Sequence, residues 1–137
     1  MGQQQLFLVT LGAFAVAIGI LVGLQIRDSR SVQANQDALV HDVTTIASRA
    51  LEWYRKPVQF GGGSRNWTRL TSAPDPLAVL QLPQTTPNGR FKIAPGASGG
   101  ITITGVGLED GDGDGKPVTV VLTITDFTPG NVAFSSR

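Results

Sequence analysis

The stretch that decides the fold is Leu6–Ile26, which reads LFLVTLGAFAVAIGILVGLQI and is apolar except for Thr10 and Gln25. At about 1.5 Å of rise per residue, a helix of this length spans roughly 30 Å, the thickness of the hydrocarbon core of a lipid bilayer. Residues 1–26 carry no charged side chain, although the chain of 137 residues contains 11 Lys and Arg and 10 Asp and Glu. We therefore expect a helix that lies in a membrane or in a bundle of similar helices.

A secretory signal peptide is the alternative explanation for such a segment. Signal peptides combine a basic start, an apolar run of about 7–15 residues and a small-x-small cleavage site. Here the leading residues MGQQQ are neutral, the apolar run is longer, and Gln25-Ile26-Arg27-Asp28 follows it. We therefore expect the apolar helix, residues 1–26, to be retained.

The next region, residues 27–56, continues the helix, because it has no glycine and no proline. Its apolar residues recur in steps of three or four, which is typical of a helix with one buried face. Pro57 ends the pattern, so the sequence predicts one helix from about Gln3 to about Arg55, about 80 Å long. We expect its buried face to pack on the rest of the chain through Leu39, Val43, Ile46, Ala50 and Trp53.

Residues 57–137 form the third predicted region, a small antiparallel β domain. Its glycine-rich segment 61–64 predicts a flexible loop, and four prolines between 74 and 87 exclude a long helix or a central strand there. Alternating and β-branched runs predict three or four strands, which include 90–93, 101–106, 118–127 and 132–134. The predicted fold class is α+β, with a long N-terminal α-helix packed on a small C-terminal antiparallel β-sheet.

The composition excludes several kinds of function. The chain has no cysteine and one histidine, so it offers no thiolate site, disulfide framework or multi-histidine metal centre. A formal net charge of +1 gives no electrostatic reason to expect nucleic acid as a partner. Nucleophiles, bases and metal ligands do not stand at workable spacings, and His41 is expected to be a solvated helix residue. We therefore expect no enzymatic activity and no organic cofactor.

The sequence DGDGDG, which begins at Asp110, is the sharpest local signal for a metal. It matches the first half of a calcium loop, with glycine at position 6 and with positions 1, 3 and 5 filled by Asp110, Asp112 and Asp114. Position 12 of the loop is Val121, where a bidentate glutamate is required. The alternative is an acidic, glycine-rich turn between two strands, so Ca²⁺ and a simple turn both stay open here.

Small residues recur along one face of the apolar helix. Ala15, Gly19 and Gly23 are four residues apart, and Gly12 lies seven residues before Gly19. This spacing lets the backbone of a neighbouring helix approach closely. The alternative is general composition, because glycine is common in membrane helices.

The order of these parts resembles that of the type IV pilins and their pseudopilin relatives, in which an apolar helix continues into an amphipathic half that packs on a C-terminal sheet. Pilins are cut after a glycine, and Gly2 followed by Gln3 occupies that place as a possible processing site. Pilins also carry a glutamate five residues further on, where this chain has Phe7. The resemblance implies a subunit held in the inner membrane and then extracted by a pilus assembly machinery into a filament of many identical copies.

The resemblance implies a structural role at the cell surface. The core of the filament would consist of the apolar helices, and the expected packing residues are Leu6, Phe7, Gly12, Ala15, Gly19 and Gly23. The leading hypothesis is therefore a pilus-like extracellular filament for adhesion, motility or surface contact. One alternative is a pseudopilin of a secretion system, a class that often binds calcium. Another is a single-pass membrane protein that displays the β domain as a binding module.

Overall fold

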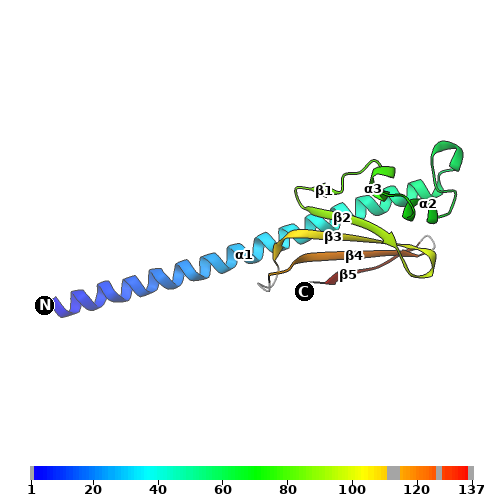
Figure 1. Ribbon diagram of the computed structural model, residues 1–137. Coiled ribbons are helices and arrows are strands. Elements are labelled where there is room, and N and C mark those ends of the chain that lie inside the picture. The colour runs from blue at the N-terminus through cyan, green and yellow to red at the C-terminus, as the bar shows by residue number, and fades with distance from the viewer. Residues whose placement is uncertain (1, 111–114, 126–127, 136–137) are drawn as a thin grey trace.

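The computed structural model describes residues 2–110, 115–125 and 128–135, and it consists of a rod that carries a head at one end (Figure 1). The rod is α1 (Gly2–Arg55), a single helix of 54 residues that includes both the apolar and the amphipathic regions. At about 1.5 Å per residue, it is about 81 Å long. The head comprises the second half of α1 and the described residues that follow it. The predicted continuity of the helix is confirmed.

The chain folds back over the end of α1, where Pro57 adopts an extended conformation with φ −62° and ψ 152°. The N–H groups of Gly63 and Arg65 donate to the carbonyl oxygens of Trp53 at 2.9 Å and Tyr54 at 2.8 Å. These bonds satisfy carbonyl groups that a helix end otherwise leaves without partners. The prediction of a flexible loop at 61–64 is therefore corrected, because this segment is bonded to the helix and two of its glycines are buried.

Short helices connect this loop to the sheet. They are η1 (Val58–Phe60), α2 (Thr68–Thr71) and α3 (Pro76–Val79). Their lengths agree with the expectation that the proline-rich connector holds no long helix. The side chain of Tyr54 stacks on that of Trp67, with ring centroids 4.3 Å apart, so the connector is held against the end of α1.

The sheet has five antiparallel strands in the order β1-β2-β3-β4-β5, so strands that follow one another in sequence are neighbours in space. The helical turn η2 (Ala97–Gly99) joins the second strand to the third. The prediction of three or four strands missed β1, which is a two-residue edge strand in the proline-rich connector. The other four lie within a few residues of the predicted runs. The strands are β1 (Thr85–Thr86), β2 (Gly89–Pro95), β3 (Ile101–Asp110), β4 (Pro117–Thr125) and β5 (Thr128–Ser135).

The hydrophobic core lies between α1 and one face of the sheet. The amphipathic half of α1 lies across β3 and β4 (Figure 1). Buried and more exposed side chains alternate along β4, as expected for a sheet that is covered on one face. The core residues are Leu39, Val43, Ile46, Ala47, Ala50, Trp53, Tyr54, Trp67, Leu70, Leu77, Leu80, Phe91, Ile93, Ile101, Ile103, Val118, Val120, Leu122 and Ile124.

A pair of glycines lets α1 approach the sheet closely. Gly89 and Gly107 face each other across β2 and β3. A Cβ atom at either position would lie 2.9 Å from a methyl carbon of Leu39, whereas carbon atoms in contact are ordinarily about 3.5–4.0 Å apart. The need for glycine here arises from a contact between distant segments, so no local pattern in the sequence indicates it.

Candidate assembly surface

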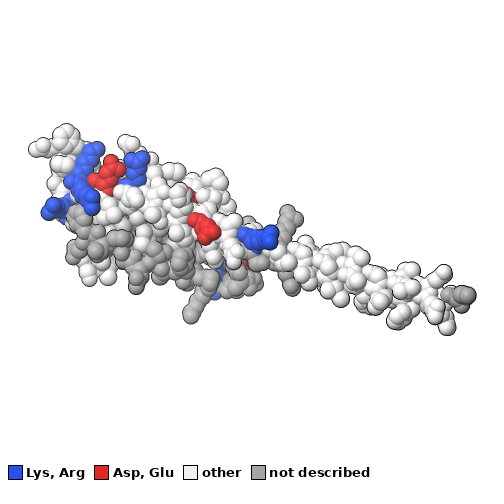
Figure 2. Space-filling model, turned by 180° about the vertical axis from the view of Figure 1, so that it is seen from behind, with Lys and Arg blue, Asp and Glu red and all other residues white. Residues whose placement is uncertain are grey.

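The apolar half of α1 projects from the head as an uncovered rod (Figure 1). Residues Gly2–Leu24 have a mean hydropathy of 2.5 and are long and apolar enough to cross a membrane. The most apolar stretch within them has no buried residue. The side chains of Leu6 and Phe7 are 70% and 69% exposed. Figure 2 shows neither acidic nor basic side chains along this part of the rod. An apolar surface of this extent requires a cover of lipid or protein.

Helical geometry also satisfies most of the backbone polar groups of this segment. Backbone N–H and C=O groups in an α-helix bond to one another, so they tolerate an environment without water. The hydroxyl of Thr10 donates to the carbonyl oxygen of Leu6 at 2.7 Å, so this polar side chain has a partner within the helix. Gly2 and Gln3, the possible processing site, lie exposed in the first turn of the same helix.

The small residues of the rod form a stripe without a partner in the described chain. Gly12, Ala15, Gly19 and Gly23 fall within an arc of about 80° around the helix axis. A Cβ atom at any of the three glycines would have no heavy atom within 4 Å. Glycine destabilises a helix by about 1 kcal/mol relative to alanine in water. Packing within the described chain therefore does not explain why glycine occupies these positions. Close approach of a neighbouring helix would explain it.

The amphipathic half of α1 fixes the rod to the head. The residues expected to pack on the sheet are all less than one-tenth exposed, with Leu39 and Ala50 at 0%. The others are Val43, Ile46 and Trp53. Because α1 is continuous, the apolar half extends directly from the half that packs on the sheet.

Polar side chains add a clamp between α1 and the β1–β2 turn. Asp42 accepts hydrogen bonds from the hydroxyl of Thr86 at 3.1 Å and from the side-chain amide of Asn88 at 2.9 Å. The amide of Asn35 donates to the carbonyl oxygen of Asn88 at 2.9 Å. The two partners of Asp42 are 44 and 46 residues further along the chain, so no local pattern in the sequence indicates them. The clamp therefore depends on the tertiary fold.

Asp42→Ala is expected to lower the free energy of unfolding of the head by about 1–3 kcal/mol, because two hydrogen bonds to a charged acceptor are lost. Asp37→Ala is the matched control, since Asp37 is an exposed carboxylate on the same helix. The control should change stability by less than about 0.5 kcal/mol. Thermal unfolding of the full-length protein in mild detergent measures both changes, and equal losses in the two variants would contradict the clamp.

The acidic segment between β3 and β4 is described only in part. Asp110 lies at the end of β3, and its Oδ2 atom accepts a hydrogen bond from the N–H of Gly115 at 2.6 Å. Asp112 and Asp114 lie outside the described residues. Within 2–110, 115–125 and 128–135, no three His, Asp or Glu side chains are grouped so that they could hold a metal ion. The calcium hypothesis therefore stays a prediction.

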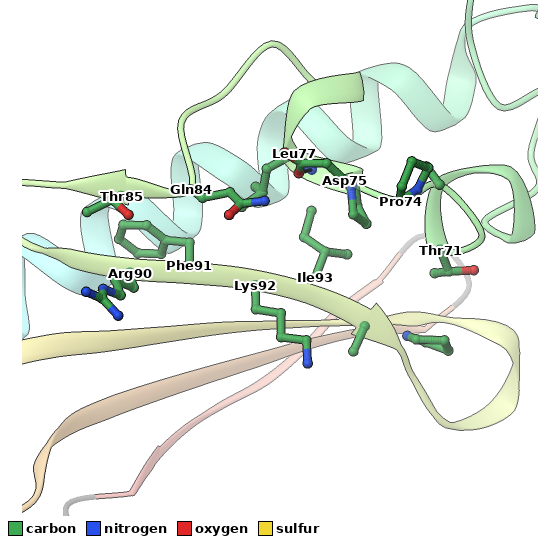
Figure 3. Close-up of a pocket in the computed structure, with 14 residues that line it drawn as sticks. Thr71, Pro74, Asp75, Leu77, Gln84, Thr85, Arg90, Phe91, Lys92 and Ile93 are labelled. Atoms are coloured by element: carbon green, nitrogen blue, oxygen red, sulfur yellow. Dashed lines mark hydrogen bonds between the residues drawn. The ribbon is translucent and has the colours of Figure 1, made fainter.

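A cleft of about 540 Å³ lies between β2 and the connector (Figure 3). Phe91 and Ile93 point from β2 towards α3, while Lys92 points away from it. Asp75 caps α3 by accepting hydrogen bonds from the N–H groups of Leu77 at 3.1 Å and Ala78 at 3.2 Å. A hydrogen bond from the side chain of Gln84, together with these N–H groups, holds the pKa of Asp75 below its usual range. The carboxylate of Asp75 therefore caps α3 and bonds to Gln84 at the wall of the cleft.

A lowered pKa in the folded protein means that the stabilisation from Asp75 is present above the unfolded pKa and is lost as the pH falls through the folded pKa. In Asp75→Asn, the cap is retained but this titration is removed. The wild-type protein should have the higher Tm at pH 7, and the difference should begin to shrink near the unfolded pKa of about 4 and disappear only below the lower folded pKa. Tm measured from pH 7 to pH 3 in both proteins tests this, and a difference independent of pH would show that the ionised carboxylate has no such role.

Comparisons of the chain with family models, curated proteins and solved structures gave no match.

Proposed function

We propose that this protein is the structural subunit of a pilus-like helical filament. The observation that carries the proposal is α1 itself, a 54-residue helix with one half packed into a folded head and the other half apolar and wholly uncovered. Such a helix is stable in lipid before assembly, and in a bundle of identical helices after it. The proposed filament would have the apolar helices at its core and the heads on its outer surface.

Two features support a transfer of the apolar helix from the lipid bilayer into a bundle of identical helices. Residues 1–26 carry no charged side chain that a dry filament core would have to neutralise. The glycine stripe at Gly12, Gly19 and Gly23 has no partner in the described chain, and it would let helix backbones approach closely. A solitary membrane anchor has no need for such a stripe.

The same rod would also serve a single-pass membrane protein that displays the head as a binding module. The two functions differ in where the protein is found and in its state of association. Electron microscopy of surface material sheared from cells that produce the full-length chain is the direct test. Labelled filaments that contain this protein would support the proposal. Its recovery only in membranes, as separate molecules after detergent extraction, would contradict it.

Filament length separates a pilus from a pseudopilus of a secretion system. A pilus subunit is expected in long filaments beyond the cell surface, and a pseudopilin in short ones confined to the envelope. Mass spectrometry of the same sheared material would also show whether the chain is cut after Gly2.

A further inference from the structure

The outer edge of β2 is only partly covered by β1. The two residues of β1 pair with the first two residues of β2. One further backbone bond follows, from the N–H of Phe91 to the carbonyl oxygen of Gln84 at 2.8 Å. The chain that precedes Gln84 is bonded to α3 instead, since the N–H of Leu82 donates to the carbonyl oxygen of Leu77 at 2.9 Å. β2 continues over residues 92–95, and we call this uncovered stretch the open edge.

The backbone of Ile93 faces the open edge. N–H groups two residues apart in a strand point to the same side, so the N–H of Ile93 points the same way as that of Phe91. The intervening residues face β3, in agreement with the hydrogen bond from the N–H of Gly96 to the carbonyl oxygen of Gly100 at 2.9 Å. Within the part of the chain that the structure describes, the N–H and C=O groups of Ile93 therefore have no partner.

The open edge is one wall of the cleft of about 540 Å³, and residues of the connector and α3 form another wall (Figure 3). These wall residues include Pro74, Asp75 and Leu77. Neighbouring strands of a sheet lie about 4.8 Å apart, and the cleft has the volume of an ordinary ligand pocket, about 300–1,000 Å³. An extended peptide can therefore lie where β1 stops and bond to the backbone of Ile93 as a further strand.

The two faces of such an added strand would meet different surroundings. On the face towards α3, the neighbouring side chains are the apolar and buried Phe91, Ile93 and Leu77. Arg90 and Lys92 are exposed and alternate with these buried residues along β2, so they lie on the other face. Side chains directly opposite each other on adjacent strands have Cβ atoms about 4.5–5.5 Å apart. Apolar side chains on the first face and acidic ones on the second would therefore be complementary to the open edge.

The two cations of this edge are available to an acidic partner. Within residues 2–110, 115–125 and 128–135, neither Arg90 nor Lys92 forms an ion pair. The carboxylate at the cleft, Asp75, already caps α3. Arg90 also borders a cavity that includes Asp110, so Lys92 is the main selective charge.

A second copy of this chain offers no matching strand at the edges of its own sheet. Pairing of two open edges would bring Lys92 of one copy towards the cations of the other, and like charges across strands are destabilising. Lysine on an edge strand is a usual protection against such pairing. β5, the strand at the opposite edge, has the sequence TPGNVAFS and no acidic residue. The charges therefore favour a partner other than this chain.

We infer that the open edge binds an extended segment of another protein, in which apolar residues alternate with acidic ones. The segment would run antiparallel to β2, in line with β1. Its backbone would bond to Ile93, and Lys92 would select its acidic side chains. This inference does not depend on the proposed filament, and it adds a binding function to the head.

Labelled synthetic peptides test the inference on the full-length protein in mild detergent. The probe is a capped heptapeptide in which glutamate alternates with valine, and the matched control has lysine in place of glutamate. The acidic peptide should bind at least about tenfold more tightly than the basic one. A third peptide has the β5 sequence, TPGNVAFS. Fluorescence anisotropy measures all three affinities.

Two further measurements locate the site. Lys92→Glu should weaken binding of the acidic peptide by about 2-fold to 30-fold, because an attractive cross-strand pair becomes repulsive. Lys56→Glu is the matched control, since Lys56 is an exposed cation outside the lining of the cleft. Amide hydrogen exchange at Ile93, followed by NMR, should slow at least about tenfold when the acidic peptide saturates the protein.

The outcomes are distinct. Preference for the acidic peptide, its reduction in Lys92→Glu beyond that in Lys56→Glu, and slowed exchange at Ile93 would together support the inference. No binding of the acidic peptide, equal binding of the two charged peptides, equal effects of the two variants or unchanged exchange at Ile93 would overturn it. Tighter binding of the β5 peptide would also overturn it and would indicate pairing between copies. Because the protein is dispersed in detergent, absence of filaments from cells would overturn the proposed function alone.

Discussion

Gly19→Leu is expected to reduce filament yield by about 5-fold to 140-fold. Gly19 lies at the centre of the stripe of small residues, where a Cβ atom meets nothing within the described chain. A leucine there would hold neighbouring helices apart, and overpacking of this kind costs about 1–3 kcal/mol, with each 1.4 kcal/mol equal to a factor of ten. The substitution keeps the segment apolar, so insertion into the membrane should continue.

Ala17→Leu is the matched control for this experiment. Residue 17 lies two positions from Gly19 and therefore on the opposite side of the helix. Immunoblots of the sheared surface fraction and of the membrane fraction measure assembly and insertion in parallel. Loss of surface protein in Gly19→Leu, with normal membrane protein and with little change in Ala17→Leu, is the expected result. Equal yields in both variants would mean that the stripe does not line a helix contact.

Leu39→Ala is expected to destabilise the head by about 2–5 kcal/mol, the usual cost of truncating a buried leucine. Leu39 is 0% exposed and packs against the paired glycines Gly89 and Gly107. These glycines have no side chains that could move to fill the cavity. For a domain of this size, each 1 kcal/mol shifts Tm by about 4–8 °C, so Tm should fall by about 10 °C or more.

Val40→Ala serves as the comparison, because Val40 is adjacent in sequence but only partly buried. Its Tm should fall by much less than that of Leu39→Ala. Near-ultraviolet circular dichroism of the full-length protein in detergent reports on the head through the buried rings of Trp53 and Trp67. Equal decreases in Tm in the two variants would show that the contact of Leu39 with the glycine pair makes no additional contribution to stability.

The architecture could be predicted because its signals are local. A run of apolar residues long enough for a bilayer, a helical period that continues to Arg55 and a proline at 57 together determine α1. Alternation and β-branched residues determine β2, β3 and β4 within a few residues. The helix residues that pack on the sheet could also be predicted from the sequence. An amphipathic helix has a single apolar face, and that face is the one that it buries.

The contacts that shape the head could not be predicted in this way. The glycine pair under Leu39, the partners of Asp42 and the hydrogen bonds that order residues 61–65 join segments up to tens of residues apart. The exposure of Phe60 and Leu108 also follows from how the connector and the sheet pack, since both residue types are often buried. Sequence periodicity thus determined the rod and four of the five strands, because both depend on near neighbours. Only the tertiary structure decided which side chains meet across the head and which stay uncovered, because that depends on strand register and on the docking of α1.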